Sequence, residues 1–187
     1  PEDYYSTTGG PKKDYTAKNK VAVIYAEGNI TDGQGEEGVI GRKYLKIIRD
    51  IRANKSIKAI VLRVNSPGGS ALMSDDILKE LDLAKAEGKP VVVSMGDYAA
   101  SGGYYIACHA DSIFASPHTL TGSIGVFAMI PNVKTMTDEK LGIDFDTIGT
   151  GPMASKFNLT QNWGTEEANI IQENIDHTYK TFLKVVS

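Results

Sequence analysis

Apolar runs of strand length alternate with helix-patterned stretches over residues 21–116, and this alternation limits the possible folds more than any other feature. The clearest run is IKAIVLRVN (57–65), which is nearly continuous in apolar residues, as expected for a strand buried on both faces of a parallel sheet. Further strands are predicted at 21–30, 90–96 and 112–116, with helices at 40–51 and 72–84. Repeated βαβ units of this kind predict an α/β fold with a mostly parallel sheet and flanking helices.

The two ends of the chain differ from this central part. Residues 1–20 are polar, contain a Gly-Gly-Pro break and show no apolar period, so we expect a flexible linker or arm there and one folded domain over 21–187. The remaining elements expected in that domain are strands at 123–130 and 143–149, a short helix at 136–142 and an amphipathic helix at 165–186, for which Thr165 is a candidate N-cap. Because the chain starts without Met and stops just after an apolar helical pattern, we expect it to be a fragment of a longer protein.

Composition excludes several functional classes. The formal net charge of -3 gives no reason to expect a nucleic-acid partner. With Cys108 as the one cysteine, no internal disulfide and no cysteine-based metal cluster can form. No apolar run in the chain approaches the ~20 residues that span a bilayer.

The segment NSPGG (65–69) directly follows the second predicted strand. Its two glycines, Gly68 and Gly69, allow a tight turn that leaves backbone N–H groups uncovered. Together with the positive end of the following helix, such amides form a site for developing negative charge. A plain glycine-rich turn explains the segment equally well.

The second segment, Gly96 to Tyr104, follows the third predicted strand and surrounds one serine with small residues. Little bulk shields the hydroxyl of Ser101, and Gly102 follows at the expected start of a helix, where its N–H lacks a partner inside the helix. This places a nucleophile next to an oxyanion donor, as acyl transfer requires. The competing interpretation is that Ser101 only caps the helix.

Taken together, these segments resemble the signal peptide peptidase A family, also called protease IV, which are serine peptidases of the Clp/crotonase fold. The resemblance rests on VNSPGGS (64–70), the run 96–107 and SPHTLTGSIGVF (116–127). It implies a Clp/crotonase-like fold for residues 21–187.

The resemblance also implies a role for each matching residue. Ser101 matches the nucleophile, and the backbone of Gly68 or Gly69 with the N–H of Gly102 matches the oxyanion donors. Ser123, in TGSIG, matches a second serine that orients the general base, although the sequence alone favours a turn residue at this position. No metal or cofactor is implied.

The general base is not evident in the chain. His118 and Lys156 are the two in-chain candidates, because His118 precedes the TGSIG segment and Lys156 lies near the place where short family members carry a catalytic lysine. At that place itself the chain has Ala154. Long family members hold two copies of the fold, with the serine in the second copy and the lysine in the first. We therefore expect a C-terminal half whose lysine comes from an absent N-terminal half, and an inactive isolated fragment.

The family resemblance carries further expectations about the whole protein. It implies cleaved signal peptides or other extended hydrophobic peptides as substrates, a ring-like homo-oligomer, and a membrane-anchored parent whose catalytic domain faces the periplasm or cell exterior. Candidate apolar pocket residues are Leu72, Met73, Met129 and Ile130. Two alternatives share the fold: a crotonase-like acyl-CoA enzyme, and a non-catalytic scaffold or assembly domain.

Overall fold

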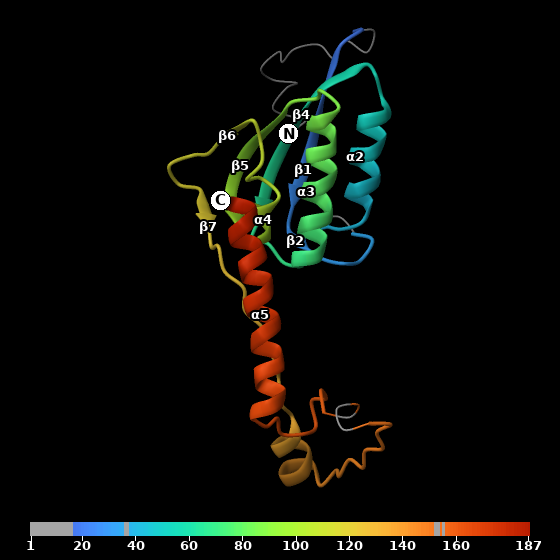
Figure 1. Cartoon of the computed structure of the whole chain (residues 1–187), viewed down its shortest axis with the longest axis vertical. Helices are drawn as coiled ribbons and strands as arrows, with labels where there is room; N and C mark the ends of the chain where they lie inside the picture. Colours follow the sequence, from blue (N-terminus) through green and yellow to red (C-terminus); the bar gives the residue numbers. More distant parts are fainter. Residues whose placement is uncertain (1–16, 36–37, 152–153, 155) are drawn as a thin grey trace, which may run out of the picture.

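A computed structural model describes residues 17–35, 38–151, 154 and 156–187, and its centre is a five-stranded parallel sheet (Figure 1). The predicted linker lies outside the described residues over 1–16, and the first strand begins at Lys20. The sheet has the order β1 (Lys20–Glu27), β4 (Ile57–Ser66), β5 (Val91–Ala100) and β6 (Ser112–Phe114), and β7 (Leu120–Gly122) pairs with the last residues of β5. A smaller parallel pair consists of β2 (Asn29–Ile30) and β3 (Val39–Ile40). The α/β fold predicted from the sequence is thereby confirmed.

Two helices cover one face of the sheet, side by side in Figure 1. They are α2 (Lys43–Ala53) and α3 (Ala71–Ala86), and each turns its apolar stripe toward the strands. The core between them contains fully buried side chains such as Ile48, Ile60 and Ile77. Glu80 on α3 joins the two helices, since its carboxylate accepts hydrogen bonds from Arg49 and Arg52 at 2.7 and 2.6 Å.

The other face of the sheet is only partly covered by the described residues, which corrects one prediction. Residues 57–65 were expected to be buried on both faces, but burial alternates along β4, with Ile60, Leu62 and Val64 buried and their neighbours only half-buried. On β1 the outward side chains Val21, Val23 and Tyr25 are 53–63% exposed. Because purely parallel sheets are normally covered on both faces, this apolar face is suited to contact with another domain.

The chain leaves this body after β7 and forms an arm that returns along α5 (Thr165–Val186), as Figure 1 shows. The predicted strands 123–130 and 143–149 do not form, because no neighbouring strand pairs with them in the described part of the chain. The predicted short helix is the π-helix η1 (Met136–Leu141). The long final helix is confirmed, but its N-cap is Gly164, whose N–H donates to Glu167 at 2.8 Å, and Thr165 is its first helical residue.

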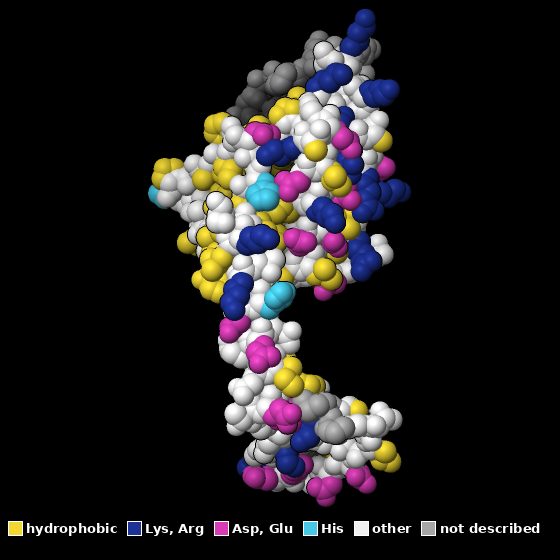
Figure 2. All heavy atoms as spheres, viewed as in Figure 1, with side chains coloured by type: hydrophobic (Ala, Val, Ile, Leu, Met, Phe, Trp, Pro, Cys, Tyr) yellow, Lys and Arg dark blue, Asp and Glu magenta, His cyan; other side chains and the backbone are white. Residues whose placement is uncertain are grey.

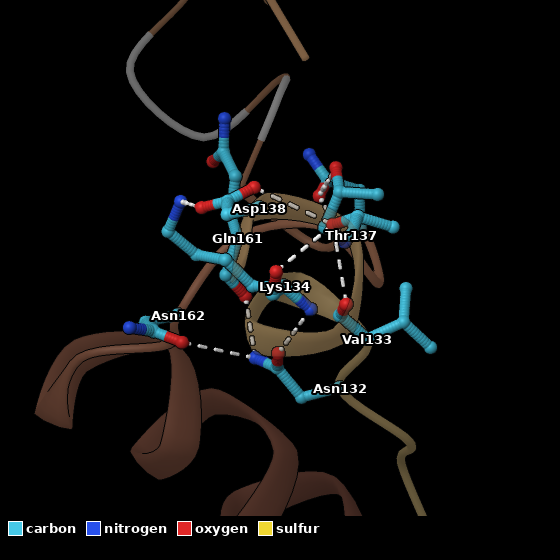
Figure 3. A network of polar contacts seen from close by, with 9 residues as sticks. Asn132, Val133, Lys134, Thr137, Asp138, Gln161 and Asn162 are labelled. Carbon is cyan, nitrogen blue, oxygen red and sulfur yellow. Dashed lines mark hydrogen bonds and ion pairs between the residues drawn. The ribbon is translucent and has the colours of Figure 1, made fainter. Parts of the chain in front are cut away.

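A polar network holds η1 to the loop before α5 at the far end of the arm (Figure 3). The side chain of Asn132 donates to the carbonyl oxygen of Gln161 at 2.9 Å, and Lys134 forms an ion pair with Asp138. Thr137 donates to the carbonyl oxygen of Lys134 at 2.9 Å. These contacts are local, so they order the tip of the arm without connecting it to the body.

The opposite end of α5 is attached to the body through His109. One ring nitrogen lies 2.9 Å from a carboxylate oxygen of Asp82 on α3, and the other lies 2.9 Å from the carbonyl oxygen of Val185 on α5. Both partners are acceptors, so only the doubly protonated ring donates to both at once. Burial lowers the pKa of His109 and Lys85 opposes protonation, but the bonds to Asp82 and Val185 outweigh them and raise the pKa.

We predict that His109 stabilises the fold more at low pH than at high pH. A pKa raised by folding contributes stability that is complete below the unfolded value of about 6.5 and is lost as the pH rises through the folded value. His109→Gln should therefore lower the free energy of unfolding at about pH 5.5 and have less effect at about pH 8.5. The side chain is 38% exposed, so solvent screening keeps the difference below about 1 kcal/mol.

Urea unfolding at both pH values measures this difference. His118→Gln, in an exposed loop, is the matched control and should behave like the unsubstituted chain. An equal effect of His109→Gln at the two pH values would contradict the prediction.

Candidate active site

The ends of three parallel strands meet at one edge of the sheet and carry the residues predicted from the sequence. Gly68 and Gly69 follow β4, Ser101 follows β5, and Ser123 follows β7. Because Ala100 is paired in register with Gly122, the two serines are the next residues on neighbouring parallel strands. The carboxyl edge of a parallel sheet is where such folds bind ligands, and the fold brings the predicted segments together at this edge.

Two glycine-containing turns, Gly68–Gly69 after β4 and Gly102 after β5, pack against each other through their backbones; we call them the glycine corners. A methyl group at Gly68 would lie 2.6 Å from the amide nitrogen of Gly102 and 2.9 Å from Cβ of Ser101. A methyl group at Gly102 would lie 2.6 Å from Oγ of the buried Ser74. Only residues without a side chain allow this approach, so the glycines are required by close packing as well as by the turn.

Ser101 and Ser123 share an unusual backbone conformation. Their φ angles are 52° and 51°, and among the described residues no other non-glycine residue has a positive φ. Such strain persists only where the surrounding structure imposes it, and it concentrates at functional sites. For Ser101 it is imposed by its N–H, which donates to Gly122 at 2.8 Å, and by its carbonyl oxygen, which accepts from Tyr105 at 2.9 Å.

Ser101 occupies the N-cap position of a short helix, but its side chain does not cap that helix. The helix α4 (Gly102–Tyr105) begins directly after it, but the Ser101 hydroxyl makes no capping hydrogen bond. No hydrogen bond is found for the hydroxyl of Ser101 or Ser123 within the described residues. Both hydroxyls are therefore available to a ligand or to a group from outside the described chain.

The backbone amides around Ser101 differ in whether they are already bonded. The N–H of Gly68 donates to Oγ of Ser66 at 3.1 Å. The N–H groups of Gly69 and Gly102 have no acceptor within the part of the chain that the structure describes. The sequence left Gly68 and Gly69 as alternatives, and the hydrogen bonding distinguishes them: the Gly68 amide already has an acceptor, whereas those of Gly69 and Gly102 have none.

These groups open into one cavity of about 890 Å³, which we call the central hollow. Its walls are mainly apolar and include Leu72 from α3, Phe127 from the arm and Phe182 from α5. Sequence reasoning missed several residues of the walls, because they approach Ser101 only through folding: Asn29, Asp75, Tyr105, His177 and Phe182. Of the four proposed apolar pocket residues only Leu72 lines the hollow; Met73 is in the core and is 1% exposed.

Neither in-chain candidate for the general base reaches the hollow. His118 is exposed in the loop between β6 and β7. Lys156 lies 3.3 Å from the carboxylate of Glu167, at the far end of α5. The residues of α5 that border the hollow begin at His177, so about 15 Å of helix or more separates the ion pair from it. The structure therefore places neither His118 nor Lys156 at the hollow. No lysine lines the hollow among the described residues.

Cys108 is not among the residues that line the central hollow. Burial raises the pKa of the Cys108 thiol to about 11, so it stays protonated near neutral pH, and its hydrogen is directed to the carbonyl oxygen of Tyr105 at 3.2 Å. Within the described ranges, no group of three or more His, Cys, Asp or Glu side chains is arranged to hold a metal ion. The helices of the described chain also include none with the length and apolarity of a membrane span.

The chain is similar in sequence to known proteases. The model of peptidase family S49 matches residues 83–187, which is more than half of the chain. Protease 4 of Haemophilus influenzae is 40% identical over 187 residues, covering 100% of this chain and 30% of that protein. Protease 4 of Salmonella typhi is 46% identical over 168 residues, covering 89% of this chain and 27% of that protein.

Two further proteins are similar to the chain at lower sequence identity. The chloroplastic serine protease SPPA of Arabidopsis thaliana is 37% identical over 171 residues, covering 88% of this chain and 25% of that protein. A solved structure, the 1510-N membrane-bound stomatin-specific protease in mutant form, aligns with a TM-score of 0.45 and 26% identity over 62% of this chain and 51% of the other. The chain thus spans less than a third of the length of the three curated relatives.

We predict that the corner at Gly69 tolerates no side chain. Its φ is +147°, and a methyl group there would lie 2.1 Å from the carbonyl oxygen of Ile30, so Gly69→Ala should destabilise the fold by about 1–3 kcal/mol. Gly125 also lines the hollow but has open space around its Cα, so Gly125→Ala should change stability by less than about 0.5 kcal/mol. Thermal unfolding of the two variants measures the difference, and equal melting temperatures would show that the corner is not closely packed.

Proposed function

Since the chain belongs to peptidase family S49, we propose that it provides the nucleophilic half of a serine endopeptidase site, with Ser101 as the nucleophile. The observation that carries this proposal is the strained pair Ser101 and Ser123 on neighbouring strands, beside two unbonded amides. A strained turn at the end of a strand exposes the hydroxyl of a nucleophile to a substrate. A serine with only a structural role gains nothing from this strain.

In the proposed reaction, Ser101 Oγ attacks the carbonyl carbon of a peptide bond and transfers its proton to a general base. The carbonyl oxygen becomes an oxyanion held by the N–H groups of Gly69 and Gly102, each worth ~2.7–4 kcal/mol by analogy with other enzymes. The tetrahedral intermediate expels the amine, which takes the proton from the base, and leaves an ester on Ser101. Water then attacks the ester carbonyl carbon and gives its proton to the base; the second tetrahedral intermediate expels Ser101 Oγ, which takes the proton back, and the carboxylic acid product is released.

We propose that the base is a neutral lysine from a segment outside this chain, in an N-terminal half of the same protein. Two observations support this: no lysine lines the hollow among the described residues, and the relatives are more than three times as long as this chain. A lysine must lose its proton before attack, and an apolar hollow favours the neutral form by desolvation. Ser123, with its unbonded hydroxyl beside Ser101, is proposed to orient that lysine.

The proposal extends to the partners of the site. The exposed apolar face of β1 is suited to the missing half or to a further copy in a homo-oligomer. Figure 2 shows hydrophobic side chains gathered along the edge formed by β6 and β7, where Phe114 and Leu120 are 64% and 61% exposed. Extended hydrophobic peptides, including cleaved signal peptides, fit the apolar walls of the hollow. A membrane-anchored parent with this domain outside the cytoplasm remains part of the same proposal.

The two alternative functions fit these observations less well. A crotonase-like acyl-CoA enzyme needs the paired amides but has no use for a strained serine between them. A scaffold domain needs neither. In both cases a serine-directed fluorophosphonate should fail to label Ser101 in the longer protein.

We predict that the isolated chain hydrolyses a peptide ester no faster than its Ser101→Ala variant, because a general base contributes about 10²–10⁴-fold to such reactions. The longer polypeptide, obtained by extending the reading frame upstream, should be active and should lose activity on Ser101→Ala. Robust Ser101-dependent hydrolysis by the isolated chain, or an upstream segment without a lysine that can reach Ser101, would refute the proposed source of the base.

We further predict that Ser123→Ala in the longer polypeptide lowers kcat/KM by about 10- to 100-fold, the effect of losing one hydrogen bond to an ionisable group. Because Ser123 acts through the base, the substitution should also shift the lower limb of the pH–rate profile, while Ser101→Ala abolishes the rate at every pH. An unchanged profile would mean that Ser123 has only a structural role.

A further inference from the structure

One carboxylate borders the central hollow. Asp75 lies on α3 one turn after Leu72, and it lines the same cavity as Ser101. Among the described residues that line the hollow, Asp75 is the one acidic side chain, and none is a lysine or an arginine. The proposed hydrolysis does not use Asp75, so its presence on a largely apolar wall calls for another explanation.

The Asp75 carboxylate is held in place by Tyr105. The hydroxyl of Tyr105 donates to Oδ1 of Asp75 at 2.7 Å, and its ring packs on Phe182 at 5.0 Å between centroids. Burial, with the hydrogen bond to Asp75, raises the pKa of Tyr105, so the hydroxyl keeps its proton and remains a donor. Oδ2 of Asp75 has no partner within the described residues, and the side chain is exposed.

This arrangement has the features of a subsite for a long cationic side chain. Lysine and arginine combine an aliphatic stem with a charged end. Leu72, one turn before Asp75 on the same wall, is 64% exposed and provides an apolar surface for the stem. The second oxygen of Asp75 is free to accept a hydrogen bond from the charged end. A fixed carboxylate also disfavours an acidic side chain at the same place, which adds to selectivity.

We propose that Asp75 determines specificity by selecting extended hydrophobic peptides that carry a lysine or arginine in the segment bound in the central hollow. This inference rests on the proposed function, because it assumes that the hollow binds peptides. It goes further by naming a charge requirement within a mainly apolar substrate and by assigning that requirement to one residue.

The test uses binding by the Ser101→Ala variant of this chain, so it needs neither a general base nor catalysis. Short leucine–alanine peptides, in which one position at a time is lysine, glutamine or glutamate, are titrated into isotopically labelled protein at one pH and ionic strength. Dissociation constants are obtained from the amide chemical shifts. At one or two neighbouring positions, the lysine peptide should bind about threefold to tenfold more tightly than the glutamine peptide, and the glutamate peptide more weakly.

Two further variants assign the effect. Asp75→Asn keeps an acceptor for Tyr105 and should remove the preference for lysine. Asp76→Asn is the matched control: it makes the same charge change on the next residue of α3, which does not line the hollow, and it should keep the preference.

The possible results separate the two proposals. If the peptides bind equally well whatever the charge, or if Asp76→Asn abolishes the preference as Asp75→Asn does, the assignment to Asp75 is wrong while peptide binding stands. If no peptide binds, the hollow of this chain does not bind peptides by itself and the inference about Asp75 is wrong, whereas the role of Ser101 is tested separately by hydrolysis with the longer polypeptide.

Discussion

The backbone contact between two glycine corners sets the geometry on which the site depends. Gly68 lies so close to the amide of Gly102 that a methyl group could not fit between them, and Gly69 lies even closer to the carbonyl of Ile30. This contact holds the starts of α3 and α4 together at the end of the sheet. The two amides without an acceptor, those of Gly69 and Gly102, belong to these closely packed corners.

Strain in the two serines is maintained by ordinary sheet pairing. The last residues of β5 and β7 are paired in register, and the N–H of Ser101 continues the pairing by donating to Gly122. A positive φ in a residue with a side chain costs on the order of 1–3 kcal/mol, which a parallel strand pair and a following helix can offset. The paired strands β5 and β7 therefore maintain the unfavourable backbone conformation of Ser101 and Ser123.

The described fold is asymmetric in its packing. One face of the sheet is covered by α2 and α3 and has a dense core, while the opposite face of β1 and the residues of the arm remain exposed, with Phe127 at 85% and Ile148 at 98%. A parallel sheet with a bare apolar face, and an arm with few buried side chains, gain stability from a neighbour. The N-terminal half proposed above as the source of the general base would be such a neighbour.

Local patterns in the sequence determined the βαβ order, the helix at 165–186 and the two corners that carry Ser101 and the glycines, because periodicity and small residues act within a few positions of the chain. Only the tertiary structure decided that Gly69 rather than Gly68 has an unbonded amide, since the acceptor for Gly68 is the buried hydroxyl of Ser66. It also decided that Asp75 and Phe182 line the same cavity as Ser101, that Lys156 does not, and that 123–130 forms no strand. These outcomes depend on distances between segments remote in sequence and on the presence of a pairing strand, which no local pattern of residues contains.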